Sequence, residues 1–276
     1  MALCLCGALT GCSAPGDPAD LALAPAAYGE LASGGACASA AKPGPAGASD
    51  AQRAPAGPSY NLRTPSNYEP RRAHPLLLVF AAAGASPKQT EALTRLTAKA
   101  TGQGFIVAYA QHRTLSPQGV QELATLPRAI AERWCIDLRR VFATGHSDGG
   151  TVSTAMALLG TTRGNLAGIA PSAAGFARQA FAAQTCAAPM PAMVLHGRQD
   201  RLFPAWGQAA AQWWAACNRC EPAKTTAHGA HCLAFQGCAA GAATLYCEHE
   251  GSHTDWPAFA AAEIVAFFAT AAAVPR

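Results

Sequence analysis

Charged side chains are scarce in this sequence, and the basic ones are scattered along it. Only 13% of the residues are Asp, Glu, Lys or Arg, and the formal net charge is +4. A nucleic-acid-binding protein usually shows a basic stripe or a known reading motif, so we exclude nucleic acid as a partner. Internal repeats are absent, and no apolar run is long enough to cross a bilayer as a helix. These absences leave a globular protein as the expected class, and 276 residues suffice for one domain with a large core.

Cysteine, by contrast, is abundant. Eleven cysteines are too many for a reduced cytosolic enzyme and indicate an oxidising compartment. The N-terminal stretch ends in Leu9-Thr10-Gly11-Cys12, which resembles the bacterial lipobox, although the basic residues that usually open an export signal are missing. We expect lipidation of Cys12, and therefore a secreted or lipid-anchored protein at the bacterial cell envelope. Another form of export and a chance cysteine-rich terminus are the alternatives.

The composition changes twice along the chain. We assign residues 1–12 to a signal or lipobox segment and 13–57, rich in Ala, Gly, Pro and Ser, to a disordered tether. From 58 to 276, short apolar runs alternate with helical patterns, which predicts an α/β fold: a mostly parallel sheet with helices on both faces. The expected strands are 76–80, 105–110, 140–144, 166–170, 192–196 and 243–247. The expected helices are 86–102, 117–134, 149–160, 205–216 and 257–272.

The segment 141–150 contains the pattern Gly145-x-Ser147-x-Gly149, followed by Gly150. A β-rich run enters it and a small-residue helical pattern leaves it, which is typical of a nucleophile elbow. Only small residues fit beside the serine because the turn is tight. Such a turn exposes the Ser147 hydroxyl and directs the backbone N–H groups that follow it toward the group under attack.

A serine hydroxyl becomes a good nucleophile when a base removes its proton and a carboxylate orients that base. Asp200 follows the expected strand 192–196, and His253 lies between the last strand and the last helix. Because loops at the carboxyl ends of parallel strands meet at one edge of the sheet, we predict that Ser147, His253 and Asp200 are nucleophile, base and orienting acid. The alternatives are a capping or turn role for Asp200 and a structural hydrogen-bonding role for His253 beside Trp256.

Backbone N–H groups would stabilise the oxyanion formed by such an attack. Asp148 follows the serine and supplies the first donor, and the loop after residues 76–80 supplies the second. In that loop Ala83 is the first candidate and Ala82 the next. This chemistry needs no metal and no organic cofactor.

Together these motifs resemble a known family. Residues 58–272 are similar to the exported poly(3-hydroxybutyrate) depolymerase-like esterases, grouped with the feruloyl and acetylxylan esterases of carbohydrate esterase family one. The resemblance implies an α/β-hydrolase fold and an esterase, with Ser147, Asp200 and His253 on the family's catalytic positions. Ala81-Ala82 stands where the family usually has His-Gly, and Asp255 widens the family's His-Thr-Trp-Pro. The matching motifs are Tyr60–Pro65, Gly145–Gly150, Cys186 with Pro191–Asp200, Trp214 with Asn218–Cys220, and His253 with Trp256-Pro257.

The cysteines are expected to form disulfides. Cys135 precedes the strand before the serine and Cys186 precedes strand 192–196, so we predict a bond between them at the amino edge of the sheet. The other cysteines leave several pairings open, of which the resemblance favours Cys220 with Cys247; we expect the stretch 218–242 to be a disulfide-held excursion. Two alternatives are a redox motif at Cys217–Cys220 and a zinc site built from His228, His231, Cys232 and His249.

The sequence therefore predicts a monomeric, exported serine esterase whose partner is an ester on a small molecule or a polymer. By the resemblance, that ester is a feruloyl or acetyl ester of a polysaccharide or a hydroxyalkanoate oligomer. A catalytically silent binding lipoprotein, and a peptidase or thioesterase, are alternatives on the same fold. Trp213, Trp214 and Trp256 are candidates for an aromatic acyl pocket or for the core.

Overall fold

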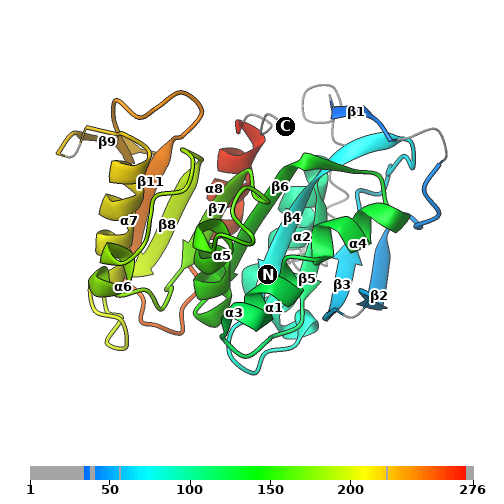
Figure 1. The fold of residues 1–276 in the computed structure, drawn as a ribbon, viewed down its shortest axis with the longest axis horizontal. Helices are drawn as coiled ribbons and strands as arrows, with labels where there is room; N and C mark the ends of the chain where they lie inside the picture. The colour runs from blue at the N-terminus through cyan, green and yellow to red at the C-terminus, as the bar shows by residue number, and fades with distance from the viewer. Residues whose placement is uncertain (1–33, 38–40, 56, 222, 272–276) are drawn as a thin grey trace, which may run out of the picture.

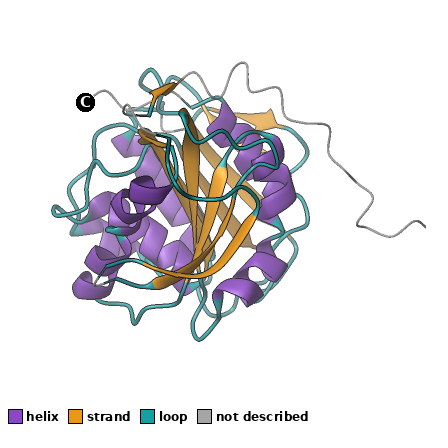
Figure 2. Ribbon diagram, turned by 90° about the vertical axis from the view of Figure 1, so that its right-hand side faces the viewer, coloured by secondary structure: helices purple, strands orange, loops and turns teal. Residues whose placement is uncertain are grey.

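One sheet runs through the whole molecule and carries helices on both faces (Figures 1 and 2). The computed structural model describes residues 34–37, 41–55, 57–221 and 223–271. Within these ranges the strands are β1 (Gly34–Ala36), β2 (Ala48–Arg53), β3 (Ser59–Arg63), β4 (Arg72–Phe80), β5 (Ile106–Ala110), β6 (Ile136–His146), β7 (Gly168–Ser172), β8 (Ala192–Gly197), β9 (Thr225–His228), β10 (Cys232–Phe235) and β11 (Thr244–His249). The helices are α1 (Pro87–Thr94), α2 (Leu96–Gly102), α3 (Pro117–Leu123), α4 (Leu126–Arg133), α5 (Asp148–Leu158), α6 (Arg178–Ala182), α7 (Trp206–Cys217) and α8 (Ala260–Ala269).

The strand order is β2-β3-β5-β4-β6-β7-β8-β11-β10-β9, with β1 added against β4. The central strands from β5 to β11 are parallel, while β2 and β3 at one edge and β10 and β9 at the other are antiparallel. This confirms the predicted α/β fold with a mostly parallel sheet. None of the helices in the described part of the chain is long and apolar enough to cross a membrane.

Continuous apolar strands are explained by a core on each face of the sheet. Along β4, Leu76, Leu78 and Phe80 join the core beneath α3 to α7, whereas Leu77 and Val79 join the core beneath α2 and α8. Because successive side chains of a strand point to opposite faces, a strand covered on both sides must be apolar at every position.

Two of the expected helices are each divided in two. The pattern over 86–102 becomes α1 and α2, which are separated by Arg95 in the left-handed region with φ of 51°. The pattern over 117–134 becomes α3 and α4, and Pro127 lies in the first turn of α4. Proline lacks an N–H group and is tolerated in the first turn of a helix but not in its interior, so a new helix begins there.

The predicted tether over 13–57 is wrong where the structure describes it. β1 pairs with β4, and β2 pairs with β3 at the edge of the sheet. Main-chain hydrogen bonds hold such strands whatever their side chains are, so a composition rich in Ala, Gly and Pro did not prevent pairing. The folded domain therefore begins before residue 58. Residues 1–33, including the predicted lipidation site Cys12, lie outside the described residues.

Trp134 anchors the segment that precedes β2. Its indole N–H group donates a hydrogen bond to the carbonyl oxygen of Pro45 at 3.0 Å. Gly44 lies so close to the indole that a β-carbon there would be 2.4 Å from the ring. Cys37 is then bonded to Cys135, the residue next to Trp134.

The disulfides differ from the predicted pairings. The bonds are Cys37–Cys135, Cys186–Cys217, Cys220–Cys238 and Cys232–Cys247. The predicted bond between Cys135 and Cys186 is wrong because β7 lies between the strands that follow these two cysteines.

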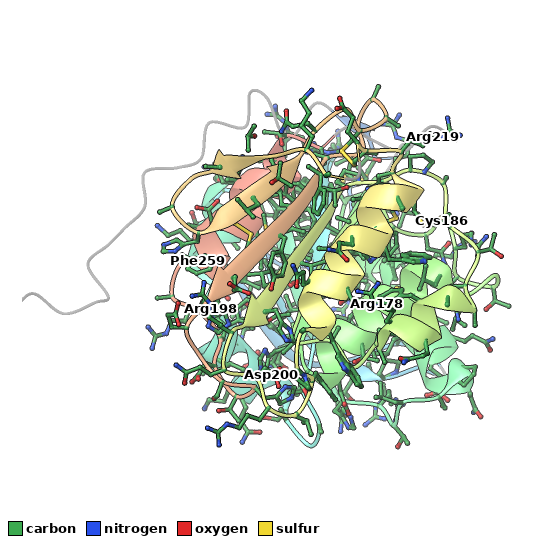
Figure 3. All side chains as sticks on the ribbon, turned by 90° about the vertical axis from the view of Figure 1, so that its left-hand side faces the viewer. Arg178, Cys186, Arg198, Asp200, Arg219 and Phe259 are labelled. Carbon is green, nitrogen blue, oxygen red and sulfur yellow. A yellow bond between two sulfur atoms is a disulfide. The ribbon has the colours of Figure 1, made fainter. Side chains whose placement is uncertain are left out.

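The predicted bond between Cys220 and Cys247 is also wrong. Cys247 of β11 lies directly opposite Cys232 of β10, which occupies it instead. The excursion over 218–242 is an antiparallel hairpin, β9 and β10, that extends the sheet, and α7 next to it is held to Cys186 by the disulfide to Cys217 (Figure 3). Since Cys217 and Cys220 belong to different disulfides, they do not form a redox pair, and the sulfur of Cys232 is not free for zinc.

Candidate active site

Ser147 occupies a strained turn between β6 and α5. Its φ and ψ are 55° and −115°, a conformation that non-glycine residues rarely adopt. The surrounding glycines explain how the turn fits. A β-carbon on Gly145 would lie 2.6 Å from the carbonyl oxygen of Phe80, and one on Gly150 would lie 2.5 Å from that of Ser172. The sharp turn and the need for small residues match the nucleophile elbow that the motif predicts.

The structure brings the three predicted triad residues together. The Nε2 atom of His253 lies 2.9 Å from Ser147 Oγ, and its Nδ1 atom lies 2.8 Å from Oδ2 of Asp200. A carboxylate accepts hydrogen bonds, so Nδ1 carries the proton of the neutral ring and Nε2 is left to accept the serine hydroxyl. This is the arrangement that a general base for Ser147 requires.

Asp200 is held as a buried anion. It lies in the loop after β8, at the end of the sheet toward which β8 and β11 run (Figure 3). Its Oδ1 atom accepts the N–H groups of Leu202 and Phe203 at 2.9 and 2.8 Å. Burial alone would raise the pKa of Asp200, but the hydrogen bonds from the Phe203 N–H group and from His253 outweigh it and hold the pKa below its usual range. The carboxylate is therefore charged at neutral pH and can stabilise an imidazolium.

The loop of His253 reaches the serine by interlocking with the loop after β8. Arg198 N donates to the carbonyl oxygen of His249 at 2.7 Å, and Gln199 N donates to that of Gly251 at 3.0 Å. Gly197 permits this approach, since a β-carbon there would lie 2.3 Å from the Gly251 oxygen. The two loops that carry base and acid are thus one hydrogen-bonded unit.

An aromatic pair adjoins His253. The ring of Phe203 stands edge-on to the imidazole with 4.8 Å between centroids, and it stacks on Trp206 at 4.6 Å. Sequence reasoning missed both residues, although they follow Asp200 closely in the chain. Of the tryptophans it singled out, Trp214 is buried in the core with Trp213 against it, whereas Trp256 packs against the ring of His146, which adjoins His253.

The two predicted oxyanion donors belong to the start of α5 and to the loop after β4. Asp148 is the first residue of α5, so its N–H group has no acceptor within that helix. The loop after β4 begins against the same turn, since a β-carbon on Gly149 would lie 3.2 Å from the carbonyl oxygen of Ala81. Ala82 closes a turn by accepting Ala85 N at 3.0 Å, and Ala83 is exposed in that turn. The role of the Ala83 N–H group stays a prediction.

Two further histidines contact this site. His112, in the loop after β5, places Nε2 3.0 Å from Oδ2 of Asp148, a contact that sequence reasoning did not foresee. His196 is buried, as expected of a packed residue. Its Nε2–H group donates to the carbonyl oxygen of Phe203 at 3.0 Å and lies 3.7 Å from Asp200 Oδ2, the oxygen that also accepts His253 Nδ1.

Comparison with known proteins establishes the fold. No family model matches the chain, and no curated protein matches its sequence. Several solved structures do match. An acetyl xylan esterase from Aspergillus awamori aligns with a TM-score of 0.60 at 14% identity over 79% of this chain and 97% of that one. The chain has an α/β-hydrolase fold.

Other solved esterases and hydrolases agree with this assignment. A thermophilic esterase from the planctomycete Thermogutta terrifontis aligns with a TM-score of 0.52 at 13% identity, over 75% of this chain and 84% of that one. The fluorophosphonate-binding serine hydrolase F of Staphylococcus aureus aligns with 0.53 at 11%, over 77% and 92% of the two chains. Identities this low establish the fold and leave the activity to be argued from the site.

Proposed function

We propose that this α/β-hydrolase is a serine esterase that cleaves carboxylic esters through an acyl-enzyme. The observation that carries the proposal is the unbroken hydrogen-bonded chain from Ser147 through His253 to the buried anion of Asp200. The backbone of Ser147 is strained, and strained residues are frequent at active sites, which supports the assignment of this serine as the nucleophile. The esterases among the structurally similar proteins support the same reaction class.

In this mechanism Ser147 Oγ attacks the ester carbonyl carbon while its proton passes to His253 Nε2. The carbonyl oxygen becomes an oxyanion that accepts N–H groups from Asp148 and from the loop of Ala83, each such donor being worth roughly 3 kcal/mol. Collapse breaks the bond to the alcohol, which leaves with the proton from His253. Water then attacks the acyl-enzyme with His253 again as base, and the acid is released as Ser147 recovers its proton.

The acyl side of the substrate is proposed to be apolar or aromatic. Phe203 and Trp206 form a half-buried aromatic surface next to the base, where an acyl group bound to Ser147 would find apolar contact. The resemblance in sequence to carbohydrate esterase family one suggests feruloyl or acetyl esters of polysaccharide, or hydroxyalkanoate oligomers. We propose no cofactor, and a monomer as the active form.

Four disulfides within the described residues indicate that the protein folds in an oxidising compartment. Such a compartment lies outside the cytoplasm in most organisms. Secretion, or anchoring to the cell envelope through a lipid on Cys12, is part of the proposal.

A substrate panel tests the proposed function. Purified protein is incubated with p-nitrophenyl acetate, p-nitrophenyl butyrate, methyl ferulate and a peptide substrate, beside Ser147→Ala and the control Ser66→Ala, which changes an exposed serine in a loop after β3. We expect the wild type and the control to hydrolyse at least one ester and Ser147→Ala to hydrolyse none. Failure of the wild type on every ester would favour the silent binding protein, and cleavage of the peptide alone would favour a peptidase.

A further inference from the structure

His146 is a buried histidine directly before the nucleophile. It is the last residue of β6, its side chain is 5% exposed, and both ring nitrogens have partners. Nε2 lies 2.7 Å from the carbonyl oxygen of His253, and Nδ1 lies 3.1 Å from Ser172 Oγ. A carbonyl oxygen can only accept, so Nε2 carries the proton and Nδ1 accepts the hydroxyl of Ser172. These contacts determine one tautomer of a neutral ring.

The position of this ring matters because His253 arrives from a distant strand. β11 is separated from β6 by β8 and β7, so the loop after β11 must cross two strand ends to reach Ser147. The ring of His146 contacts this loop at His253, the residue that reaches Ser147. Through Ser172 it is also joined to the end of β7, and the carbonyl oxygen of Ser172 accepts the N–H group of Ser147 at 2.9 Å. His146 and Ser172 thus form a cluster that holds the main chain of both the nucleophile Ser147 and the base His253.

The charge state of the ring agrees with this role. Burial lowers the pKa of His146 to about 4, although the hydrogen bond to His253 opposes the shift. Above that pH the ring is neutral and has one N–H group to donate. It is therefore not a second base, and its contact with the carbonyl oxygen persists over the pH range in which a histidine-dependent esterase works.

We propose that His146 is a positioning residue: its Nε2–H group fixes the main chain of His253 so that the imidazole meets Ser147 Oγ. This inference rests on the proposed esterase function. Asp200 and His146 have complementary tasks, since Asp200 orients the imidazole through Nδ1 while His146 holds the backbone to which that imidazole is attached. Loss of the backbone contact leaves the substrate-binding surface intact but lets the base drift from the nucleophile.

Kinetics of two substitutions separate the hydrogen bond from simple packing. His146→Leu removes the donor, whereas the amide nitrogen of His146→Gln can replace Nε2 and stays neutral at every pH. A displacement of about 1 Å near reacting groups costs about 100-fold in rate, so we expect kcat of His146→Leu to fall about 100-fold with KM within about threefold of wild type. His146→Gln is expected to recover at least about tenfold of that loss, since it restores the donor.

The control is His74→Leu, which replaces a buried histidine of β4 beyond the site; it should keep kcat near the wild-type value. A folded His146→Leu with wild-type kcat would overturn the inference. So would equal losses in the Leu and Gln variants, because packing alone would then explain them. If His146→Leu does not fold, Ser172→Ala tests the same cluster: an unchanged kcat there would overturn the inference, and a fall of about tenfold would support it.

A readout independent of turnover is the tautomer itself. Nitrogen NMR of 15N-labelled histidine in the intact wild-type protein at pH 6 should show His146 neutral and protonated at Nε2. A charged ring, or a ring protonated at Nδ1, would overturn the inference even if the protein proves to be an esterase. Absence of ester hydrolysis by the wild type would instead overturn the proposed function, before any variant is compared.

Discussion

Gly149 lies against the main chain of Phe80. A β-carbon on Gly149 would lie 2.0 Å from the carbonyl oxygen of Phe80, far inside any permitted contact, and the opposing atom is backbone that cannot rotate away. The first turn of α5 is thus seated on the end of β4. Since β4 pairs with β6, this contact sets the height at which Ser147 leaves the sheet and the distance to the loop of the proposed second oxyanion donor.

Gly149→Ala is therefore expected to disrupt the elbow. Overpacking typically costs about 1–3 kcal/mol, and the rigid backbone favours the upper end of this range, so we expect loss of esterase activity together with a lower free energy of unfolding. Urea unfolding followed by circular dichroism measures the second quantity. Gly160→Ala is the matched control, because a β-carbon there meets nothing within 4 Å, and it should keep both activity and stability. Equal stability of the two variants would contradict the packing described for the elbow.

The triad predicts losses of at least about 10⁴-fold on substitution of either its base or its acid. His253→Ala removes the base and should lower kcat by about 10⁴- to 10⁶-fold, while Asp200→Asn should cost about 10⁴-fold by favouring the wrong tautomer. Steady-state hydrolysis of a p-nitrophenyl ester checks both. His228→Ala, at an exposed position of β9, and Asp50→Asn, at an exposed position of β2, are the controls and should turn over normally. Wild-type activity in either triad variant would remove that residue from the mechanism.

The central fold and the triad positions were predictable from sequence for a physical reason. The runs Leu76–Phe80 and Ala192–Leu195 are apolar at every position because both faces of those strands are covered. A β-carbon on any of the glycines around Ser147 would lie less than 3 Å from neighbouring backbone atoms. The glycines of the motif are therefore a direct sign of the tight turn. Once the strands were assigned as parallel, the loops of Asp200 and His253 had to meet the serine at one edge.

The sheet edges and the disulfides were not predictable in this way. β2 has only one fully buried side chain, and β9 has none, so neither shows an apolar pattern. Main-chain hydrogen bonds hold them, and these leave no mark on composition. Pairing of Cys135 depended on which strand lies beside β6, which is a property of the whole topology. Phe203 and Trp206 were missed because no motif marks a residue that acts by ring contact alone.

Among the four disulfides that the structure describes, the Cys37–Cys135 bond should be the most stabilising. It closes a loop of 98 residues, for which the chain-entropy model gives about 4.7 kcal/mol, against about 3 kcal/mol for the 18-residue separation of Cys220–Cys238. Replacing both partners by Ala in each pair and measuring urea unfolding should show this order. Peptide mapping without reduction should find Cys37 joined to Cys135; a Cys135–Cys186 peptide would contradict the structure.

Stability should fall in mild acid. Burial lowers the folded-state pKa of His146 to about 4 and also lowers the pKa of His196. Below about pH 6.5 these two histidines are therefore protonated in the unfolded chain while they are still neutral in the folded protein. The stability that His146 contributes is present above about pH 6.5 and is lost as the pH falls toward 4, by roughly 3 kcal/mol in total. Asp200, whose pKa is depressed, adds a further loss only at lower pH. The titratable groups whose charges act on His146 are His253, His249, Asp200 and Asp255.

Urea unfolding at pH 7.5, 6 and 4.5 measures this loss, and His146→Gln should reduce it by the share of His146 because Gln binds no proton, while the share of His196 remains. A free energy of unfolding that stays constant from pH 7.5 to 4.5 would contradict the burial of these histidines as neutral rings.

The most direct test of a nucleophilic Ser147 is the mass of the protein after reaction with a fluorophosphonate. Wild-type protein should gain a single phosphonyl adduct, and digestion should place it in the tryptic peptide 141–163, on Ser147. Ser147→Ala should gain none, and His253→Ala should react far more slowly. An unmodified wild type, or an adduct that persists in Ser147→Ala, would contradict the account.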